Sequence, residues 1–500
     1  MEGKGNRGRR GLWRGNMGKF IEEYIRDAAG ILPSSRQYAW QRLEFYAFIH
    51  FSVNTFTGRE WGGGDEDPEI FNPSGLDASQ WARVCKSAGM RGIILTCKHH
   101  DGFCLWPSGY TDHSVKKSPW KGGKGDVVRE VSEACRREGL KFGIYLSPWD
   151  RHERTYGHSE AYNQYFINQL RELLTGYGDI FCVWFDGACG EGTNGKRQVY
   201  DWKAYYSLVR ELQPEAAISV CGPDVRWCGN EAGHCRKSEW SVVPAYLRDA
   251  EKTAEKSQQT DDGEFSKHIN PEDEDLGSRE AVKNAGPLVW YPAEVNTSIR
   301  PGWFYHQEED SQVKTPGELL EVYYNSVGGN ANFLLNIPPD RRGLIHENDA
   351  LCLERLGQFI REGFLENLAS GAEVSASNTW DHAHGAKNIL SSGPDSFWRP
   401  EEGAGEAVLE ILLNGEKTFD TVVLMENIKW SGQRTESFLL EVREAGGWRE
   451  VYKGTVIGYK RICRFGKTTT EAIRLKITSS RIYPTLEYFG VFLGKHWSMQ

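Results

Sequence analysis

The sequence has no apolar stretch of the ~18–20 residues that a membrane-spanning helix needs, so we expect no contact with a membrane. It also has no extended basic block, and its net charge is −9 at pH 7. Nucleic acid is therefore not expected as a partner. The basic N-terminus, MEGKGNRGRRGLWRGNMGKF, lacks the continuous apolar region of a secretory signal. We therefore expect a cytoplasmic protein.

Cysteine pairs with metal-site spacing are missing as well. The eleven cysteines are scattered, and several lie in apolar runs, where cysteine behaves as a small hydrophobic residue. This pattern predicts reduced thiols. Cys221, Cys228 and Cys235 are seven residues apart, which is not the close spacing of a structural zinc site. No GxGxxG motif follows the first predicted strand, which disfavours a dinucleotide-binding fold. We expect neither a metal nor another cofactor.

Short apolar runs alternate with longer amphipathic runs between about residues 40 and 365. Apolar runs predict strands at 44–51, 91–97, 141–147, 179–186 and 216–222. Helical spacing predicts helices at 78–90, 126–140, 161–178 and 199–212. The strands are apolar on both faces, as in a parallel sheet covered by helices. The pattern therefore predicts an α/β fold with a (β/α)8-like TIM barrel, and a doubly wound sheet is the alternative.

The pattern changes after about residue 365. Two-residue alternation in FLLEV (438–442) and AIRLKI (472–477), with a turn signal AGGW between them, predicts a C-terminal β-sandwich of the discoidin-like kind. We divide the chain into an N-terminal tail (1–35), a (β/α)8-like catalytic domain (36–365) and a β-sandwich (366–500). The polar segment 251–280 is expected to be an irregular insertion beside the mouth of the barrel.

Polar side chains stand where four predicted strands end. They are His50 after the first strand, His99, His100 and Asp101 after the second, Tyr145 on the third and Asp186 after the fourth. The carboxyl ends of barrel strands form one rim, so these side chains are expected to meet there. Each could instead have a structural role, and Asp186 in particular could cap a following helix.

A second carboxylate would complete a site for acid–base chemistry. Glu231, in a glycine-flanked loop after the fifth strand, is the main candidate. Glu294 is another, because burial among aromatic residues would raise its pKa. Glycoside hydrolysis uses two such groups, one at the anomeric carbon and one that protonates the leaving oxygen. The chain is also rich in tryptophan, and four of these side chains could stack on a sugar ring: Trp61, Trp149, Trp227 and Trp303.

Eight segments resemble those of one enzyme family, and they span about residues 36–345. They are FIHFSVNTF, REWGGG, CKHHDGFCLWPS, GIYLSPWDRH, VWFDGA, GPDVRWCGNEAG, WYPAEVNTSIRPGWFY and NANFLLNIPPDRRGL. The set resembles the retaining α-L-fucosidases of glycoside hydrolase family 29. The forms HFSVNTF and SPWDRH resemble the branch that prefers α1,3- and α1,4-linked fucose on branched, Lewis-type glycans.

The resemblance implies a role for each matching residue. Asp186 would be the nucleophile that forms a covalent fucosyl-enzyme, and Glu231 would be the acid/base. Glu294 would line the aglycone side. The fucose pocket would include His50, Glu60, Trp61, His99, His100 and Tyr145, with Trp227 also expected to bind the sugar. The substrate would be a fucosylated oligosaccharide. An enzyme that is not exported would fit a glycan-scavenging bacterium that imports short oligosaccharides. The oligomeric state has no signal in the sequence.

Two alternatives remain open from the residues alone. The first is a metal-dependent barrel hydrolase, because a His-His-Asp sequence on a barrel rim could bind a metal. Adjacent residues of a strand point to opposite faces, however, so His99 and His100 cannot both be ligands unless the chain leaves the pleat there. Neither histidine is part of an HxH or HExxH motif that would support a metal site. The second is a non-catalytic carbohydrate-binding barrel. The presence of carboxylates at both 186 and 231 disfavours it.

Overall fold

The structure, a computed structural model, describes residues 23–251, 253, 275–391 and 393–494. Within these residues, eight parallel strands form the sheet of the first domain, in the order β5-β4-β3-β2-β1-β10-β9-β6. Their bounds are β1 (Phe45–Ile49), β2 (Gly92–Lys98), β3 (Lys141–Leu146), β4 (Cys182–Phe185), β5 (Ala217–Val220), β6 (Arg226–Trp227), β9 (Ala293–Ser298) and β10 (Ala331–Asn336). Each of the five strands predicted from the sequence is present.

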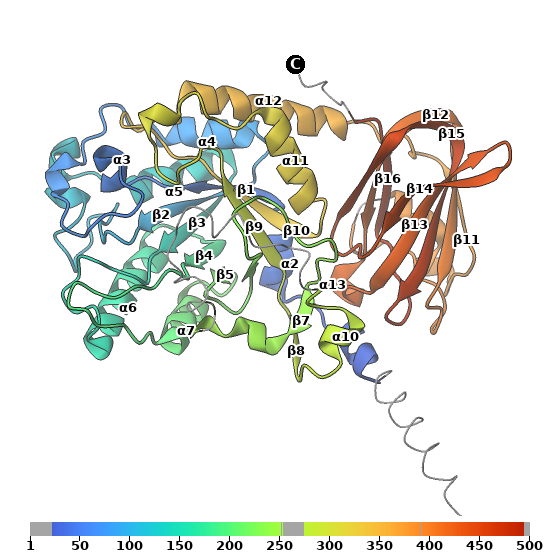
Figure 1. Cartoon of the computed structure of the whole chain (residues 1–500), viewed down its shortest axis with the longest axis horizontal. Helices are drawn as coiled ribbons and strands as arrows, with labels where there is room; N and C mark the ends of the chain where they lie inside the picture. Colours follow the sequence, from blue (N-terminus) through green and yellow to red (C-terminus); the bar gives the residue numbers. More distant parts are fainter. Residues whose placement is uncertain (1–22, 252, 254–274, 392, 495–500) are drawn as a thin grey trace, which may run out of the picture.

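The sheet is a nearly closed barrel. β1 lies between β2 and β10, and a parallel bridge between Ser219 and Val225 joins the two ends of the strand order. This arrangement confirms the predicted barrel and excludes the doubly wound alternative. Figure 1 shows helices around the sheet. They include α4 (Ala78–Ser87), α5 (Val127–Glu138), α6 (Ser159–Gly176), α7 (Trp202–Leu212), α11 (Pro316–Ser326) and α12 (Glu347–Gly363).

Capping residues fix where these helices begin and end. Asp126 accepts a hydrogen bond from the backbone N–H of Arg129 and starts α5, and Gly139 ends it in the left-handed conformation (φ 73°). Thr315 and Glu318 form a capping box at the start of α11. The helices therefore have the bounds that their local sequence favours.

The barrel is irregular on one side. Residues 221–225 connect β5 directly to β6. The chain between β6 and β9 includes the antiparallel pair β7 (Val242–Pro244) and β8 (Leu288–Trp290), with the short helix α10 (Arg279–Val282) before β8. The predicted insertion at 251–280 falls largely outside the described residues. Among those that are described, no helix is long and apolar enough to cross a membrane.

The last part of the predicted tail is folded. Residues 23–29 are helical, and Ile25, Ala28 and Ala29 are buried. Ala28 packs with Val242 and Trp290, and α2 (Ser35–Gln41) follows. The prediction of a tail up to residue 35 is therefore wrong for residues 23–35. Apolar side chains of this segment pack against the β7–β8 pair and against Ile428 and Tyr459 of the second domain.

The second domain is antiparallel, as predicted. In the described residues beyond 372, six strands are joined by hydrogen bonds into one sheet. They are β11 (Glu373–Ala376), β12 (Ala407–Met425), β13 (Thr435–Glu444), β14 (Gly447–Gly454), β15 (Arg461–Ser480) and β16 (Tyr488–Phe492). The two runs at 438–442 and 472–477 lie in β13 and β15. The long strands β12 and β15 pair along most of their length, with register shifts where they bulge.

The two domains are firmly packed together, side by side (Figure 1). Val423, Ile462 and Phe492 of the second domain belong to the same hydrophobic cluster as the barrel helices. Glu44, just before β1, accepts hydrogen bonds from Tyr459 Oη (2.8 Å) and Lys460 Nζ (2.6 Å). Because β1 begins there, this contact lies at the end of the strand opposite the rim that carries the polar residues.

Candidate active site

Five of the polar residues predicted at the strand ends lie together on the rim of the barrel: His50, His99, His100, Tyr145 and Asp186. The sixth, Asp101, is fully buried and accepts a hydrogen bond from Ser52 Oγ at 3.3 Å instead. The ring centroids of His50 and His99 are 5.5 Å apart, and those of His99 and Tyr145 are 5.8 Å apart. Tyr145 Oη donates a hydrogen bond to Asp186 Oδ2 at 2.8 Å, and His100 Nε2 lies 3.8 Å from the same oxygen. Four strands thus deliver one cluster, as expected for parallel strands that end on the same edge.

Asp186 is positioned from two directions. Tyr145 contacts Oδ2, and the backbone N–H of Ala188 donates to Oδ1 at 2.9 Å. The side chain keeps 23% of its surface exposed. Asp186 does not cap a helix, because Asp201 is the N-cap of the following helix α7. A carboxylate that is fixed in place and still reachable from solvent has the properties of a nucleophile.

Hydrogen bonds to the Nδ1 atoms of His50 and His100 define the tautomers of the two rings. Asn336 Nδ2 donates to Ser298 Oγ and to the carbonyl of Trp303, so Asn336 Oδ1 accepts from His50 Nδ1 at 2.8 Å. Ser147 Oγ donates to the Trp149 carbonyl and therefore accepts from His100 Nδ1 at 2.7 Å. In both neutral rings Nε2 is left as an acceptor for a hydroxyl group.

Burial keeps these histidines neutral. It lowers the pKa of His50 to about 3 and the pKa of His100 to about 4, and it lowers the pKa of His99 well below its ordinary value. His99 Nδ1 is also buried without a hydrogen-bond partner among the described residues. Three neutral imidazoles side by side can bind uncharged hydroxyl groups, which is what a sugar presents.

The same shifts predict how stability depends on pH. In the unfolded chain His50 and His100 bind protons below about pH 6.5, whereas in the folded protein they do so only near pH 3 and 4. The free energy of unfolding should therefore fall as the pH drops from 6.5 toward 4, by about 1.4 kcal/mol per pH unit for each such histidine.

Urea unfolding at several pH values between 7 and 4 measures this slope. His100→Gln should make it shallower, and His382→Gln should leave it unchanged because His382 is exposed on the second domain. An equal slope in wild type and His100→Gln would contradict the assignment of a buried, neutral His100.

His99 and His100 differ from the expectation of opposite faces. Their ring centroids are only 4.1 Å apart, and both rings lie within the cluster. The reason is that β2 ends at Lys98, after a register shift between Thr96 and Lys98, so the chain has left the pleat before the two histidines. The exception to strand alternation, in which the chain leaves the pleat before the two histidines, therefore applies here.

Glu60 and Trp61 lie on a loop at the edge of the cluster. The Glu60 carboxylate accepts hydrogen bonds from the backbone N–H groups of Trp303 (2.7 Å) and Phe304 (3.1 Å), and it contacts His306 Nε2 at 2.7 Å. It therefore connects two rim loops. Trp61 is 43% exposed, and its ring meets His100 edge-on with centroids 5.5 Å apart. The exposed indole can stack on a bound sugar.

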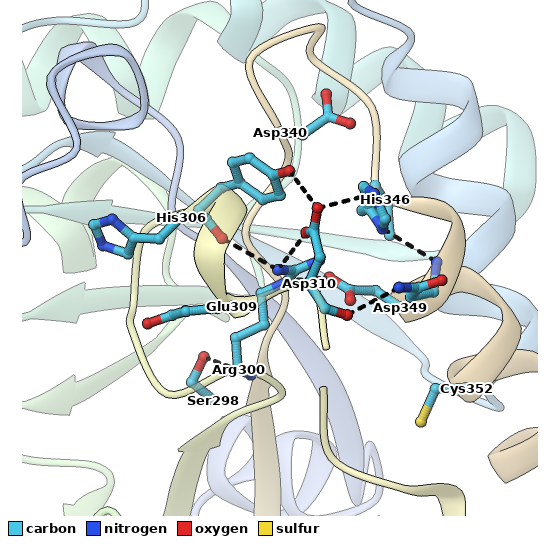
Figure 2. A network of polar contacts seen from close by, with 12 residues as sticks. Ser298, Arg300, His306, Glu309, Asp310, Asp340, His346, Asp349 and Cys352 are labelled. Atoms are coloured by element: carbon cyan, nitrogen blue, oxygen red, sulfur yellow. Dashed lines mark hydrogen bonds and ion pairs between the residues drawn. The ribbon is translucent and has the colours of Figure 1, made fainter. Parts of the chain in front are cut away.

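Figure 2 shows an ion-pair network centred on Arg300, which Asp310 and Asp349 contact. Trp303 and Phe304 follow Arg300 on the same loop. Arg300 is fully buried; its Nε donates to Asp349 Oδ2 (2.8 Å) and its Nη1 to Asp310 Oδ1 (2.9 Å). Asp349 lies on α12, so this helix fixes the loop through one guanidinium. None of these three residues was identified from the sequence. The one feature that could have indicated Arg300 is that an arginine occurs in the aromatic stretch SIRPGWFY.

Trp227 is the last residue of β6, and Glu231 lies on the loop that follows it. Trp227 is half-buried, packs against the cluster inside the barrel and donates from Nε1 to Asn296 Oδ1 at 2.9 Å. Glu231 is partly buried in the next loop. Asn230 stabilises this loop, because its Nδ2 donates to the His234 carbonyl at 2.9 Å and its Oδ1 accepts from the N–H of Ala232 at 3.1 Å.

Glu294 does not line the aglycone side. Its side chain is completely buried inside the barrel, where it accepts hydrogen bonds from Tyr46 Oη, Trp184 Nε1 (2.7 Å) and Ser219 Oγ (3.2 Å). The predicted direction of its pKa shift is correct, since burial raises it. Its predicted location is wrong, because on β9 the alternation of side chains points it into the barrel, and no part of it reaches the rim surface.

The described part of the chain contains no cluster of side chains suited to bind a metal ion. No group of three or more His, Cys, Asp or Glu side chains there has the arrangement to hold a metal ion. All eleven cysteines are free thiols, and ten of them are buried. The rim histidines bond instead to Asn336 and Ser147.

A parallel barrel with a fixed, reachable carboxylate, neutral histidines and an exposed tryptophan on its C-terminal rim belongs to the class of carbohydrate-processing barrel enzymes. The family model described as "Alpha-L-fucosidase" matches residues 33–363. The chain belongs to this family, glycoside hydrolase family 29, which confirms the resemblance in its motifs and its assignment as a glycoside hydrolase.

Individual relatives cover nearly the whole chain. It is 42% identical over 471 residues to "Alpha-L-fucosidase 1" of Arabidopsis thaliana, an alignment that covers 93% of this chain and 88% of the relative. A solved structure from Bacteroides ovatus has a TM-score of 0.83 at 44% identity and covers 96% of this chain and 77% of its own. A Ruminococcus gnavus GH29 fucosidase in complex with fucose has a TM-score of 0.81 at 30% identity, with 93% and 96% covered.

Proposed function

We propose that the protein removes terminal α-L-fucose, linked α1,3 or α1,4, from branched Lewis-type oligosaccharides with retention of configuration. Family membership supports fucoside hydrolysis. The observation that carries the mechanism is Asp186, a partly exposed carboxylate that Tyr145 and a backbone N–H hold in place beside His100. The linkage preference rests on the resemblance of HFSVNTF and SPWDRH to one branch of the family.

The reaction has two steps. Asp186 attacks the anomeric carbon while protonated Glu231 gives its proton to the glycosidic oxygen, so that the C–O bond to the aglycone breaks and a fucosyl ester forms. Water then attacks the same carbon, Glu231 takes a proton from it, and the bond to Asp186 breaks. Fucose leaves with its original anomeric configuration, and both carboxyl groups return to their starting protonation states.

The remaining rim residues bind the sugar. The unprotonated Nε2 atoms of His50 and His100 accept hydrogen bonds from fucose hydroxyl groups. The 3.8 Å between His100 Nε2 and Asp186 Oδ2 separates two acceptors, so a hydroxyl donor near both would be favourable there. Trp61 and Trp227 stack on the apolar faces of the sugars.

A panel of oligosaccharides with α1,2-, α1,3-, α1,4- and α1,6-linked fucose tests the linkage preference. We expect kcat/KM to be at least about 100-fold higher for the branched α1,3 and α1,4 substrates, since an aglycone with unmatched polar groups loses several kcal/mol of transition-state binding. Proton NMR of the first product should show the retained α-anomer. Preferential cleavage of the α1,2 or α1,6 linkage would contradict the proposed preference, and an inverted product would contradict the mechanism.

Binding of fucosylated glycans without turnover would favour the carbohydrate-binding alternative, and loss of activity with a chelator would favour the metal-dependent one. We also propose that the protein acts in a reducing, cytoplasmic compartment of a bacterium, which the eleven free thiols support.

A further inference from the structure

Glu294 is an acidic residue inside the barrel, below the rim. Donors from three different strands converge on its carboxyl group: Tyr46 Oη from β1, Trp184 Nε1 from β4 and Ser219 Oγ from β5. The side chain has no solvent exposure. All its hydrogen-bond partners are therefore parts of the barrel wall.

Such a carboxyl group is costly to bury. Within the described residues Glu294 forms no ion pair with Lys, Arg or His, and burial raises its pKa. An apolar side chain would fill the same space without the cost of removing a carboxyl group from water. The three hydrogen bonds compensate this cost in part, and they fix the position of each donor.

One of these donors leads to the reaction centre. Trp184 is on β4, and Asp186 directly follows the end of that strand. The Trp184 ring stacks on Tyr145, with centroids 5.4 Å apart and planes inclined by 29°. Tyr145 Oη in turn donates to Asp186 Oδ2 at 2.8 Å. Glu294, Trp184, Tyr145 and Asp186 therefore form a continuous chain of contacts.

We propose that Glu294 is a positioning residue, which holds the Trp184 indole so that Tyr145 stays aligned with the Asp186 carboxylate. The inference rests on the proposed role of Asp186. Glu294 does not touch the substrate. Removing its contact to Trp184 lets the indole and the tyrosine shift, and a misplacement of about 1 Å at a reacting group can reduce the rate about 100-fold.

Kinetics of three variants test the proposal on a fucosylated oligosaccharide. Glu294→Ala should lower kcat by about 100-fold while KM changes less than about threefold, because the sugar-binding histidines are untouched. Glu294→Gln should recover most of kcat, since its amide oxygen still accepts from Trp184 and its NH2 can donate to Tyr46. Trp184→Phe retains an aromatic side chain but loses the indole N–H, and should lower kcat about tenfold. This variant replaces Glu294→Ala in the test if Glu294→Ala does not fold.

A double-mutant cycle separates positioning from a general loss of stability. In a Tyr145→Phe background, where the contact to Asp186 is already lost, Glu294→Ala should have little further effect on kcat. Asn332→Ala is the matched control: Asn332 is also buried, lies beside Glu294 in the β9–β10 register and bonds to the Trp40 carbonyl. Its effect, if any, should be additive with Tyr145→Phe.

Additive effects of Glu294→Ala and Tyr145→Phe, or a full loss of kcat in Glu294→Gln, would overturn the positioning role. Neither result would affect the proposed function, which is decided separately by wild-type turnover and by Asp186→Ala.

Discussion

Replacement of Asp186 by alanine should lower kcat on a fucosylated oligosaccharide by about 10³-fold or more while fucose still binds. The variant loses the atom that forms the bond to the anomeric carbon. It keeps the imidazoles of His50, His99 and His100, which we expect to bind the sugar hydroxyl groups. Steady-state kinetics measure the loss of turnover, and isothermal titration with fucose measures the remaining affinity.

Asp179→Ala is the matched control for this prediction. Asp179 precedes β4 as Asp186 follows it, but it is exposed and lies at the opposite end of the strand, away from the rim. Its replacement should leave kcat and KM unchanged. Wild-type turnover in Asp186→Ala would show that another group attacks the sugar.

Glu231→Ala should behave differently from Asp186→Ala. If Glu231 supplies the proton to the leaving oxygen, a substrate whose leaving group needs no proton should still react, and azide should restore turnover by attacking the fucosyl-enzyme. A Glu231→Ala variant that hydrolyses natural oligosaccharides at the wild-type rate would contradict the acid/base assignment.

The second large effect concerns stability. Lys98 and Asp150 form an ion pair of 2.8 Å with neither side chain exposed, and Lys98 Nζ also contacts Gln169 Oε1 at 2.9 Å. Burial alone would raise the pKa of Asp150, but Lys98 and backbone N–H groups hold it below its ordinary value. Asp150→Ala should lower the free energy of unfolding by about 3–5 kcal/mol, because it leaves a buried ammonium group without its counter-charge.

Chemical denaturation measures this loss, and a surface pair gives the control. Lys86 and Glu138 are 3.2 Å apart, but the lysine side chain is 54% exposed. Glu138→Ala should therefore cost less than about 1 kcal/mol. Because Lys98 directly precedes the two histidines and Asp150 directly follows Trp149, Asp150→Ala should also weaken fucose binding. Equal stability losses in the two variants would show that the buried pair is not specifically stabilising.

The strand–helix alternation and the identity of the rim residues were predictable from the sequence because both depend on local signals. Apolar runs such as 91–97 and 141–147 specify strands, and residues such as Asp126 and Gly139 mark where a helix begins and ends. Parallel strands end on one edge, so His50, Tyr145 and Asp186 could be expected to meet without knowledge of any long-range contact.

Other parts of the site depend on contacts between distant residues. Strand alternation placed His99 and His100 on opposite faces, but the end of β2 at Lys98 brings their rings together. The setting of Glu294 among aromatic residues fitted either a binding surface or the barrel interior, and its partners lie 75 to 248 residues away in the chain.

The sequence by itself determined the class of fold, the family and the residues that gather on the rim, because periodicity, capping and contiguous motifs act over a few residues. The tertiary structure alone decided which imidazole nitrogen accepts a hydroxyl, which carboxyl group is inside the barrel and how Arg300 holds the Trp303 loop. These properties come from burial and from hydrogen bonds between segments that meet only when the barrel closes.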